Sequence, residues 1–347
     1  ALWRRRNQRP LRYDRDMLPR LDLSQCGRSI AENVDLVQRA EALGWEGAWV
    51  SEINGADAVT SAACIAGALT SGRVGSAIFP MQTRDPLLLA MTAASLSGIA
   101  AGGFVLGLGT STRIIIQDWH ATPWGDSPLT LTRECVDLVR RFLDGERVTT
   151  ESGRWLYRRA SLTTPPKSAV PIYLAALNDS MLQLAGEIAD GVILNFVSVG
   201  DLIHAKSKIA EGAGFAGRSL DNFEYVIFFR STVTDDYELV RERYQRELFT
   251  YVMAPVYQKM FARGGHADLC EEIQSLWRDG ERETALATLP EAFIRDRTLI
   301  GNATEIHTRL AEYQDAGLDS SMIFPVAIPT NDYFDDTLRT IEALAPE

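Results

Sequence analysis

The sequence alternates between two hydrophobic periods, and this alternation constrains the fold more than any other feature. Apolar residues first recur at the three- and four-residue spacing of one helical face, as Ile30, Val34, Val37, Ala40 and Leu43. Gly44 is expected to end this helix, and the apolar stretch 47–51 that follows is typical of a short buried strand. The basic unit is therefore a helix followed by a strand.

The same unit repeats along the chain. Helices are predicted at 60–69, 86–100, 129–143, 181–188, 202–210 and 236–248, and strands at 74–80, 104–109, 171–176, 191–196, 223–233 and 320–325. One more helix has capping-box spacing from Asn302 to Glu305, and Ile306, Leu310 and Tyr313 form its apolar face. Most of the strands are apolar without interruption, as parallel strands covered on both faces should be.

These segments predict an α/β fold, a (β/α)8 TIM barrel with insertions, as a single domain over residues 21–347. Seven strands are clear, and only the polar stretch 11–19 is left for the eighth. The stretch 148–157, which resembles a hairpin, and the charge-rich helical block 251–290 are interpreted as insertions in the barrel. Residues 1–20 are interpreted as a basic N-terminal extension that contains the poor first strand.

A doubly wound Rossmann sheet is the alternative architecture. Gly107 and Gly109 follow a predicted strand and form part of a phosphate-binding fingerprint. The third glycine of that fingerprint is missing, and no clear helix start follows it. Eight similar strand and helix units therefore favour the barrel.

Charge and cysteine content exclude several classes of partner. The formal net charge is -11, and residues 1–20 hold seven arginines and two aspartates, so the rest of the chain is more acidic than the whole. An acidic body disfavours nucleic acid, and no apolar run reaches the roughly 18 residues that span a bilayer. The four cysteines lack CxxC spacing, which favours a reduced cytoplasmic compartment over a zinc site or a disulfide framework.

In a barrel, catalytic groups lie at the C-terminal ends of the strands. The segments expected there are 51–57, 79–84, 109–120, 175–179, 195–198 and 324–327. The sequence contains no HExxH, P-loop or GxSxG motif and no paired cysteine and histidine cluster, so neither a metal site nor a catalytic triad is predicted.

Four side chains in these segments are candidates for chemistry. Trp119 can stack on a ring, and His120 beside it offers an acid or base that titrates near neutrality. Glu52 and Asp57 follow the second strand and could serve in proton transfer or substrate orientation. The alternative for both carboxylates is a capping or surface role.

A candidate phosphate site lies where a strand ends just before a helix. Its residues are Ala175, Ala176, Leu177 and Asn178, whose backbone N–H groups would act together with the helix dipole. Asp179 argues against this site unless its carboxylate points away or only caps the helix, because a carboxylate repels a phosphate.

The chain also resembles a known family over nearly its whole length. The similar stretches include AEALGWEGAWVSE at 40–52, TRDPLLLAMTAASL at 83–96, GGFVLGLGTS at 102–111 and PIYLAALNDSMLQLAGEIADGVILNF at 171–196. WHATPW at 119–124 and LIGNATEIHTRLAEYQDAGLD at 299–319 belong to the same set. In order and spacing they resemble the luciferase-like flavin monooxygenase superfamily, in particular its branch of oxidoreductases that use the deazaflavin coenzyme F420, such as methylenetetrahydromethanopterin reductase.

The resemblance implies a cofactor site at the ends of three strands. A non-prolyl cis peptide that backs the deazaflavin ring would fall between Ala77 and Ile78. The stretch Gly109, Thr110, Ser111 and Thr112 would let the backbone approach the ring and its ribityl chain. The family also places the cofactor phosphate at 175–178, and Arg295 matches a basic position near it. The apolar walls would be Phe79, Phe196 and Trp119.

The resemblance has departures. Luciferases and sugar-phosphate dehydrogenases of the superfamily have a histidine directly after the acidic residue that ends strand two, and here Ile53 follows Glu52. Thr112 stands where the sugar-phosphate dehydrogenase has a catalytic glutamate. Light emission and sugar-phosphate oxidation are therefore both disfavoured.

The resulting hypothesis is an F420-dependent oxidoreductase that moves a hydride between the deazaflavin and a small organic substrate, with His120 or Glu52 in proton transfer. An FMN-dependent monooxygenase with the same fold is the alternative within this class. A barrel that binds no flavin and serves only as a binding protein is the alternative from another class. Barrels of this family commonly form homodimers or larger homo-oligomers, and the same is expected here.

Overall fold

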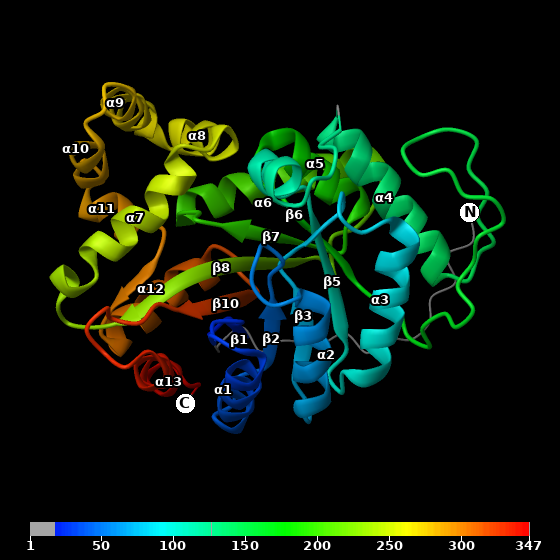
Figure 1. Cartoon of the computed structure of the whole chain (residues 1–347), viewed down its shortest axis with the longest axis horizontal. Coiled ribbons are helices and arrows are strands. Elements are labelled where there is room, and N and C mark those ends of the chain that lie inside the picture. The colour runs from blue at the N-terminus through cyan, green and yellow to red at the C-terminus, as the bar shows by residue number, and fades with distance from the viewer. Residues whose placement is uncertain (1–17, 126, 347) are drawn as a thin grey trace.

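The computed structural model describes residues 18–125 and 127–346, and in it eight parallel strands close into a barrel (Figure 1). The ring is closed because β1 pairs with both β2 and β10, and β10 pairs with β8. The barrel strands are β1 (Arg20–Ser24), β2 (Gly47–Val50), β3 (Arg73–Ser76), β5 (Phe104–Gly109), β6 (Ile172–Ala175), β7 (Gly191–Asn195), β8 (Glu224–Val233) and β10 (Ser320–Pro325). This confirms the TIM barrel and excludes the Rossmann sheet.

The first strand corrects the sequence-based prediction. It was expected at 11–19, most of which lies outside the described residues, but β1 begins only at Arg20. All five residues of β1 are buried, and Asp22 and Arg20 among them gave the segment a polar appearance. The polar side chains are buried here because they belong to a charge network inside the barrel.

The helices cover the outside of the barrel and occur close to the predicted positions. They are α1 (Ile30–Ala42), α2 (Ala58–Ala68), α3 (Pro86–Ile99), α4 (Pro128–Leu143), α5 (Asp179–Ile188), α6 (Val199–Ala216), α7 (Arg241–Val252), α12 (Ala303–Asp315) and α13 (Tyr333–Ala343). Most begin at a side chain that accepts a backbone N–H of the first turn, namely Ser29, Asp57, Asp85, Ser127, Asn178, Ser198, Asn302 and Asp332. The capping box between Asn302 and Glu305 is confirmed.

Several shorter elements are added to the barrel. Strand β4 (Phe79–Pro80) extends the third strand, and β9 (Leu299–Gly301) pairs with the end of β8. In the stretch expected to resemble a hairpin, Val148 and Ala160 exchange two backbone hydrogen bonds of 2.7 and 3.0 Å. The block 251–290 contains α8 (Pro255–Phe261), α9 (Ala267–Arg278) and α10 (Arg282–Ala287), and α11 (Glu291–Arg295) follows; these helices lie together beside α7 (Figure 1).

The barrel interior has an apolar middle layer. Its fully or largely buried side chains are Trp49, Val105, Tyr173, Ile193, Val226 and Met322. The larger core lies between the outer faces of the strands and the helices. The middle layer separates the N-terminal end of the barrel, which we call the bottom, from the C-terminal end, which we call the mouth.

The bottom of the barrel is closed by buried charges. Asp22 is 0% exposed and accepts hydrogen bonds from Arg73 (2.6 Å), Trp49 (2.8 Å) and Ser320 (2.9 Å). Arg73 also donates to Glu224 at 2.9 Å. Burial alone would lower the pKa of Arg73, but the two carboxylates raise it well above its ordinary value. The bottom is therefore a plug of buried polar side chains whose charges are paired with one another.

Candidate active site at the barrel mouth

Three strand ends meet at the mouth, as the sequence predicted. Gly109 ends β5, and a Cβ at this position would lie 2.9 Å from the side chain of Ile78 and 3.2 Å from Ala175. The ends of the third, fourth and fifth barrel strands therefore approach one another too closely for any larger residue at Gly109. Ala77, Ile78 and Ala175 are each partly exposed, so together they form an apolar floor at the mouth.

The peptide bond between Ala77 and Ile78 is cis, as the resemblance implied. Two hydrogen bonds to residues at the end of β2 hold the backbone around this peptide bond. The Ala77 N–H donates to the Val50 carbonyl at 2.7 Å, and the Ser51 hydroxyl donates to the Ala77 carbonyl at 2.9 Å. The position of this floor is thus fixed by the end of β2.

The loop after β5 carries the predicted ring-stacking and acid–base residues. Ser111 adopts a left-handed conformation (φ 57°), and Thr112 precedes a six-residue π-helix (Ile114–Trp119) that the sequence did not predict. Trp119 is 54% exposed. The His120 Nε2 lies 2.6 Å from the Ile53 carbonyl oxygen and must carry the hydrogen, because a carbonyl only accepts. In the neutral ring, Nδ1 is then left as the base.

The two predicted carboxylates after β2 are joined by an arginine that the sequence analysis did not single out. Arg84 donates to Glu52 from Nε (3.0 Å) and Nη2 (2.7 Å), and Nη2 also donates to Asp57 at 3.1 Å. Asp57 in addition caps α2 and accepts from the Thr60 hydroxyl at 2.6 Å; this bond, ahead of the charge of Arg84, lowers the Asp57 pKa. Arg84 lies in the predicted segment 79–84, but only the fold brings it to Glu52.

The predicted phosphate site lies at the start of α5. Asn178 caps the helix by accepting from the Met181 N–H at 3.0 Å. The Asp179 carboxylate points away to His204 (2.9 Å) and Arg263 (3.2 Å). The hydrogen bond from His204 is the main reason why the Asp179 pKa is lowered. The condition set by the sequence analysis, that Asp179 should point away, is met.

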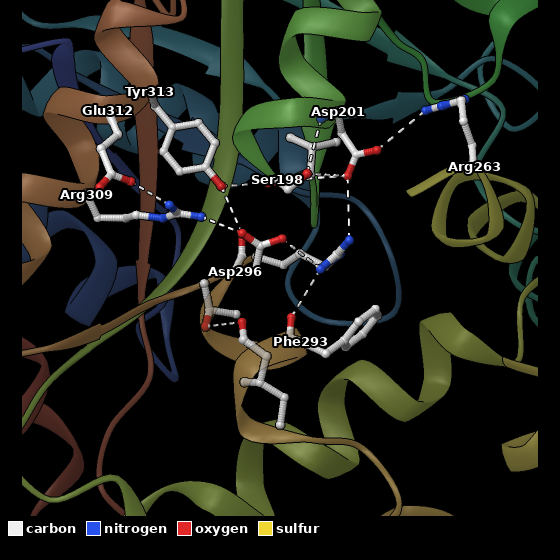
Figure 2. A network of polar contacts seen from close by, with 12 residues as sticks. Ser198, Asp201, Arg263, Phe293, Asp296, Arg309, Glu312 and Tyr313 are labelled. Atoms are coloured by element: carbon white, nitrogen blue, oxygen red, sulfur yellow. Dashed lines mark hydrogen bonds and ion pairs between the residues drawn. The ribbon is translucent and has the colours of Figure 1, made fainter. Parts of the chain in front are cut away.

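Arg263 continues into a network that reaches the start of α6 (Figure 2). Asp201 forms a capping box with Ser198 and lies 3.7 Å from Arg263 and 3.8 Å from the buried Arg297. Burial lowers the Arg297 pKa, and its Nε has no hydrogen-bond partner among the described residues. Both arginines come from segments far along the chain from α5, so sequence spacing offered no signal for them.

Arg295, the basic residue chosen from the resemblance, is engaged elsewhere. Its Nε donates to Glu291 at 2.5 Å, its Nη1 donates to the Ile300 carbonyl at 2.8 Å, and its guanidinium lies over the ring of Tyr237. Among the described residues, the arginines that contact the first residues of α5 and α6 are therefore Arg263, 32 positions before Arg295, and Arg297, two positions after it.

Two predicted apolar walls are not at the surface of the mouth. Phe79 and Phe196 are each 0% exposed, and both pack in the core beneath arginines. The partly exposed aromatic side chains at the strand ends are instead Phe228 and Phe324, whose ring centroids are 5.9 Å apart. Period-two alternation along β8 places Phe228 inward together with Val226, which the sequence analysis could have used.

A buried arginine organises the same side of the mouth. Arg230 is 6% exposed and donates to Glu247 (2.6 Å), to Asn195 (2.5 Å) and to the Tyr251 hydroxyl (2.9 Å). Its guanidinium lies 4.1 Å from the centroid of Phe196. A charge directly after the apolar run 225–229 was the available sequence signal, because a buried charge requires partners.

Comparisons with known proteins agree with this architecture. A family model described as luciferase-like monooxygenase matches residues 17–320. A protein of Mycobacterium tuberculosis named as a coenzyme F420-dependent oxidoreductase is 26% identical over 330 residues, covering 87% of this chain and 93% of that protein. The 5,10-methylenetetrahydromethanopterin reductase of Methanopyrus kandleri is 26% identical over 304 residues, covering 83% of this chain and 87% of the reductase.

Solved structures show the same fold. The coenzyme F420-dependent tetrahydromethanopterin reductase from Methanopyrus kandleri superposes with a TM-score of 0.79 at 24% identity, covering 95% of this chain and 97% of the other. An F420-dependent secondary alcohol dehydrogenase in complex with an F420-acetone adduct gives a TM-score of 0.75 at 18% identity, with 94% and 99% covered. Since the family model spans most of the chain, the protein is an oxidoreductase of the luciferase-like monooxygenase family.

Proposed function

We propose that this protein binds the deazaflavin coenzyme F420 at the barrel mouth and transfers a hydride between it and a small organic substrate. The observation that carries the proposal is the close approach of Ile78 and Ala175, which is possible because Gly109 between them has no side chain. It leaves the partly exposed Ala77, Ile78 and Ala175 as an apolar surface for a planar ring. The relatives named above as F420-dependent support the choice of cofactor.

The residues at the start of α5 fit a phosphate. Backbone N–H groups at a helix N-terminus attract anions, and Arg263 adds a cation beside Asp179. The unpaired Nε of the buried Arg297 is a further donor in the same network. In this proposal the phosphate lies near 175–178 with Arg263, and Arg295 has no part in holding it.

The deazaflavin supplies a hydride carrier, and the protein has to place the substrate and manage the accompanying proton. His120 presents Nδ1 as a proton donor or acceptor while Nε2–H is anchored on the Ile53 carbonyl. Glu52, held by Arg84, has the role of orienting this part of the mouth. Trp119 covers the substrate as an exposed aromatic surface.

The first experiment is a titration of the purified protein with oxidised F420 and, separately, with FMN, followed by absorbance and fluorescence quenching. We expect binding of F420 in the micromolar range or tighter, and weaker binding of FMN. A preference for FMN would favour a monooxygenase instead. Binding of neither would contradict the proposal and leave a barrel that uses no flavin.

Two pairs of variants locate the site. Gly109→Ala adds a Cβ within 3.2 Å of two neighbours and is expected to weaken F420 binding by about tenfold or more, whereas Gly67→Ala meets open space and is the matched control. Arg263→Gln is expected to weaken binding and Arg295→Gln to leave it unchanged. The reverse order for the arginines would restore Arg295 as the phosphate ligand.

We also propose that the protein assembles with a second copy through α3. Leu88, Met91 and Ile99 lie along one stripe of this helix and are 39%, 50% and 49% exposed. Contiguous exposed apolar side chains of this kind mark interaction surfaces. Sedimentation equilibrium should give a dimer or larger for the natural chain and a smaller species for Met91→Lys. A monomeric natural chain would contradict the proposal.

No helix in the described part of the chain is long and apolar enough to cross a membrane.

A further inference from the structure

A small cavity at one side of the mouth is not used by the function proposed above. Its volume is about 230 Å³, and it lies where the chain leaves β1, β8 and β10. Arg28, Arg243, Phe324 and Tyr333 line it, together with most of the segment 325–331. Ligand pockets for whole drug-sized molecules are about 300 to 1,000 Å³, so this cavity suits one end of a ligand.

The two charged residues in the lining are both arginines. Arg28 lies with its guanidinium 4.3 Å from the centroid of the Tyr333 ring, and the Tyr333 hydroxyl donates to the Cys26 carbonyl. Arg28 is therefore stacked on a ring that is itself fixed. Arg243 lies in the first turn of α7, which has no side-chain cap. Both arginines are exposed, and a cation at this end of a helix is opposed by the helix dipole, so the helix itself does not stabilise Arg243.

Neither arginine forms an ion pair with a carboxylate in residues 18–125 or 127–346, whereas Arg73 and Arg230 at other positions of the barrel each have one. The nearby acids are engaged otherwise. Glu32 accepts from the backbone N–H of Arg28, and Asp336 accepts from the Ile328 N–H at 2.7 Å and pairs with Arg339. The lining of the cavity thus has two cations and no carboxylate.

Most of the remaining lining is apolar and offers few backbone donors, and its polar side chains are engaged, since the Asn331 amide donates to Asp336 and the Tyr333 hydroxyl to Cys26. Pro325 and Pro329 have no N–H, the Val326 N–H donates to Ser231, and the Ile328 N–H is taken by Asp336. An anion in the cavity would therefore be bound by the guanidinium groups, which match carboxylate and phosphate geometry. The apolar walls would contact the carbon atoms that carry it.

The cavity adjoins the aromatic residues of the mouth. Phe324 lines the cavity, and its ring is in edge contact with Phe228 at the inward side of β8. β10 and β1 are neighbours in the barrel, and the floor of Ala77, Ile78 and Ala175 lies at the ends of the third and fifth barrel strands. Phe324 therefore belongs both to the lining of the cavity and to the aromatic pair on the inward side of the mouth.

We propose that the organic substrate of this enzyme carries a carboxylate or a phosphate, which binds between Arg28 and Arg243 while its reacting carbon faces the deazaflavin. This inference rests on the proposed function for the identity of the reaction. The existence of the anion site does not depend on the proposed function, since the site consists of residues outside the proposed cofactor-binding set.

The test uses three probes with the same ring and different charge: benzoate, phenyl phosphate and benzyl alcohol. Each is titrated calorimetrically into the full-length protein, with and without F420. We expect at least one anion to bind tenfold or more tightly than benzyl alcohol. The anion that binds more tightly identifies whether the site prefers a carboxylate or a phosphate. Arg28→Gln and Arg243→Gln should each weaken anion binding, and the double variant should remove the preference over the alcohol. Arg147→Gln, an exposed arginine outside the cavity, is the control.

Three results would overturn the inference. The first is equal binding of the alcohol and both anions, and the second is a preference that survives in the double variant with an unchanged melting temperature. The third is a double variant that loses F420 affinity and keeps the preference for the anion, which would assign the two arginines to the cofactor. Failure of F420 to bind, with the anion preference intact, would contradict the proposed function and leave the anion site standing.

Discussion

The two ends of the barrel use charge in opposite ways. At the bottom, Asp22 is completely buried, and Arg73 bonds both to it and to Glu224. At the mouth, Arg28 and Arg243 lie beside a cavity without a carboxylate partner among the described residues. Charges that satisfy each other leave nothing for a ligand to bind, whereas unpaired cations do. The comparison separates a stabilising network from a binding surface, and substitutions at the two ends should have different effects.

The largest effect is expected from Asp22→Ala at the bottom. Removing one partner of a buried ion pair leaves an uncompensated charge and costs about 3 to 5 kcal/mol of unfolding free energy. Urea denaturation measures this loss. Asp35→Ala is the control, because its pair with Arg39 is about half exposed and should contribute less than about 1 kcal/mol. Equal losses in both variants would remove the distinction between the plug and an ordinary surface pair.

The second prediction concerns the mouth. His120→Ala should lower turnover by about 100-fold, because proton transfer by a positioned side chain contributes about 10² to 10⁴. Deazaflavin affinity and melting temperature should hardly change, since the His120 contact with Ile53 is local. His307→Ala, on α12, is the histidine control. Unaltered turnover in His120→Ala would remove this residue from the proton-transfer role.

The third prediction concerns how the stability of the bottom end of the barrel depends on pH. Partial burial would raise the pKa of Glu41, but hydrogen bonds from the backbone of Thr70, Ser71 and Gly72 lower it to about 2. Since the folded pKa is lowered, this stabilisation is present above the ordinary pKa of 4.5 and is lost as the pH falls toward 2. Glu41→Gln should cost about 1 to 2 kcal/mol at neutral pH.

The difference between Glu41→Gln and the natural chain should shrink across the same pH window, measured by denaturation at several pH values. Glu242→Gln, an exposed helical pair with Arg246, is the control. A difference that stays constant down to pH 2 would mean that the ionised carboxylate is not the stabilising form.

The smallest effect on stability is expected for Trp119→Ala at the mouth. Trp119 is 54% exposed, so its removal should change the unfolding free energy by less than about 0.5 kcal/mol. If it covers the substrate, kcat/KM should still fall by up to about tenfold, the equivalent of an aromatic contact. A loss of stability without a loss of activity would place Trp119 with the scaffold.

Much of the fold could be predicted from the sequence, and the failures have a physical cause. Strands such as 104–109 and the segment 191–194 are apolar throughout, so they can be recognised without knowing which residues pack against them. The first strand was placed too early because Asp22 and Arg20 interrupt its apolar pattern. Their burial depends on Arg73, Glu46 and Glu224, which are far away along the chain.

The candidate site was predicted in part. Backbone features followed from local sequence, such as the glycine at position 109 and the strand-to-helix turn capped by Asn178. The arginines could not be assigned in the same way. Arg84, Arg230 and Arg263 each acquire their role from a partner on another strand or helix, and no spacing rule selects one arginine among many.

By itself the sequence determined the alternation of helices and strands, and with it the parallel barrel and the edge at which polar loops gather, because hydrophobic period and helix caps are local properties. The tertiary structure alone decided which charges are paired and which are free. That outcome depends on short distances between residues far apart in the chain, such as 2.6 Å between Asp22 and Arg73 and 3.7 Å between Asp201 and Arg263. Coulomb interactions and hydrogen bonds act over such distances and are set only once the chain has folded.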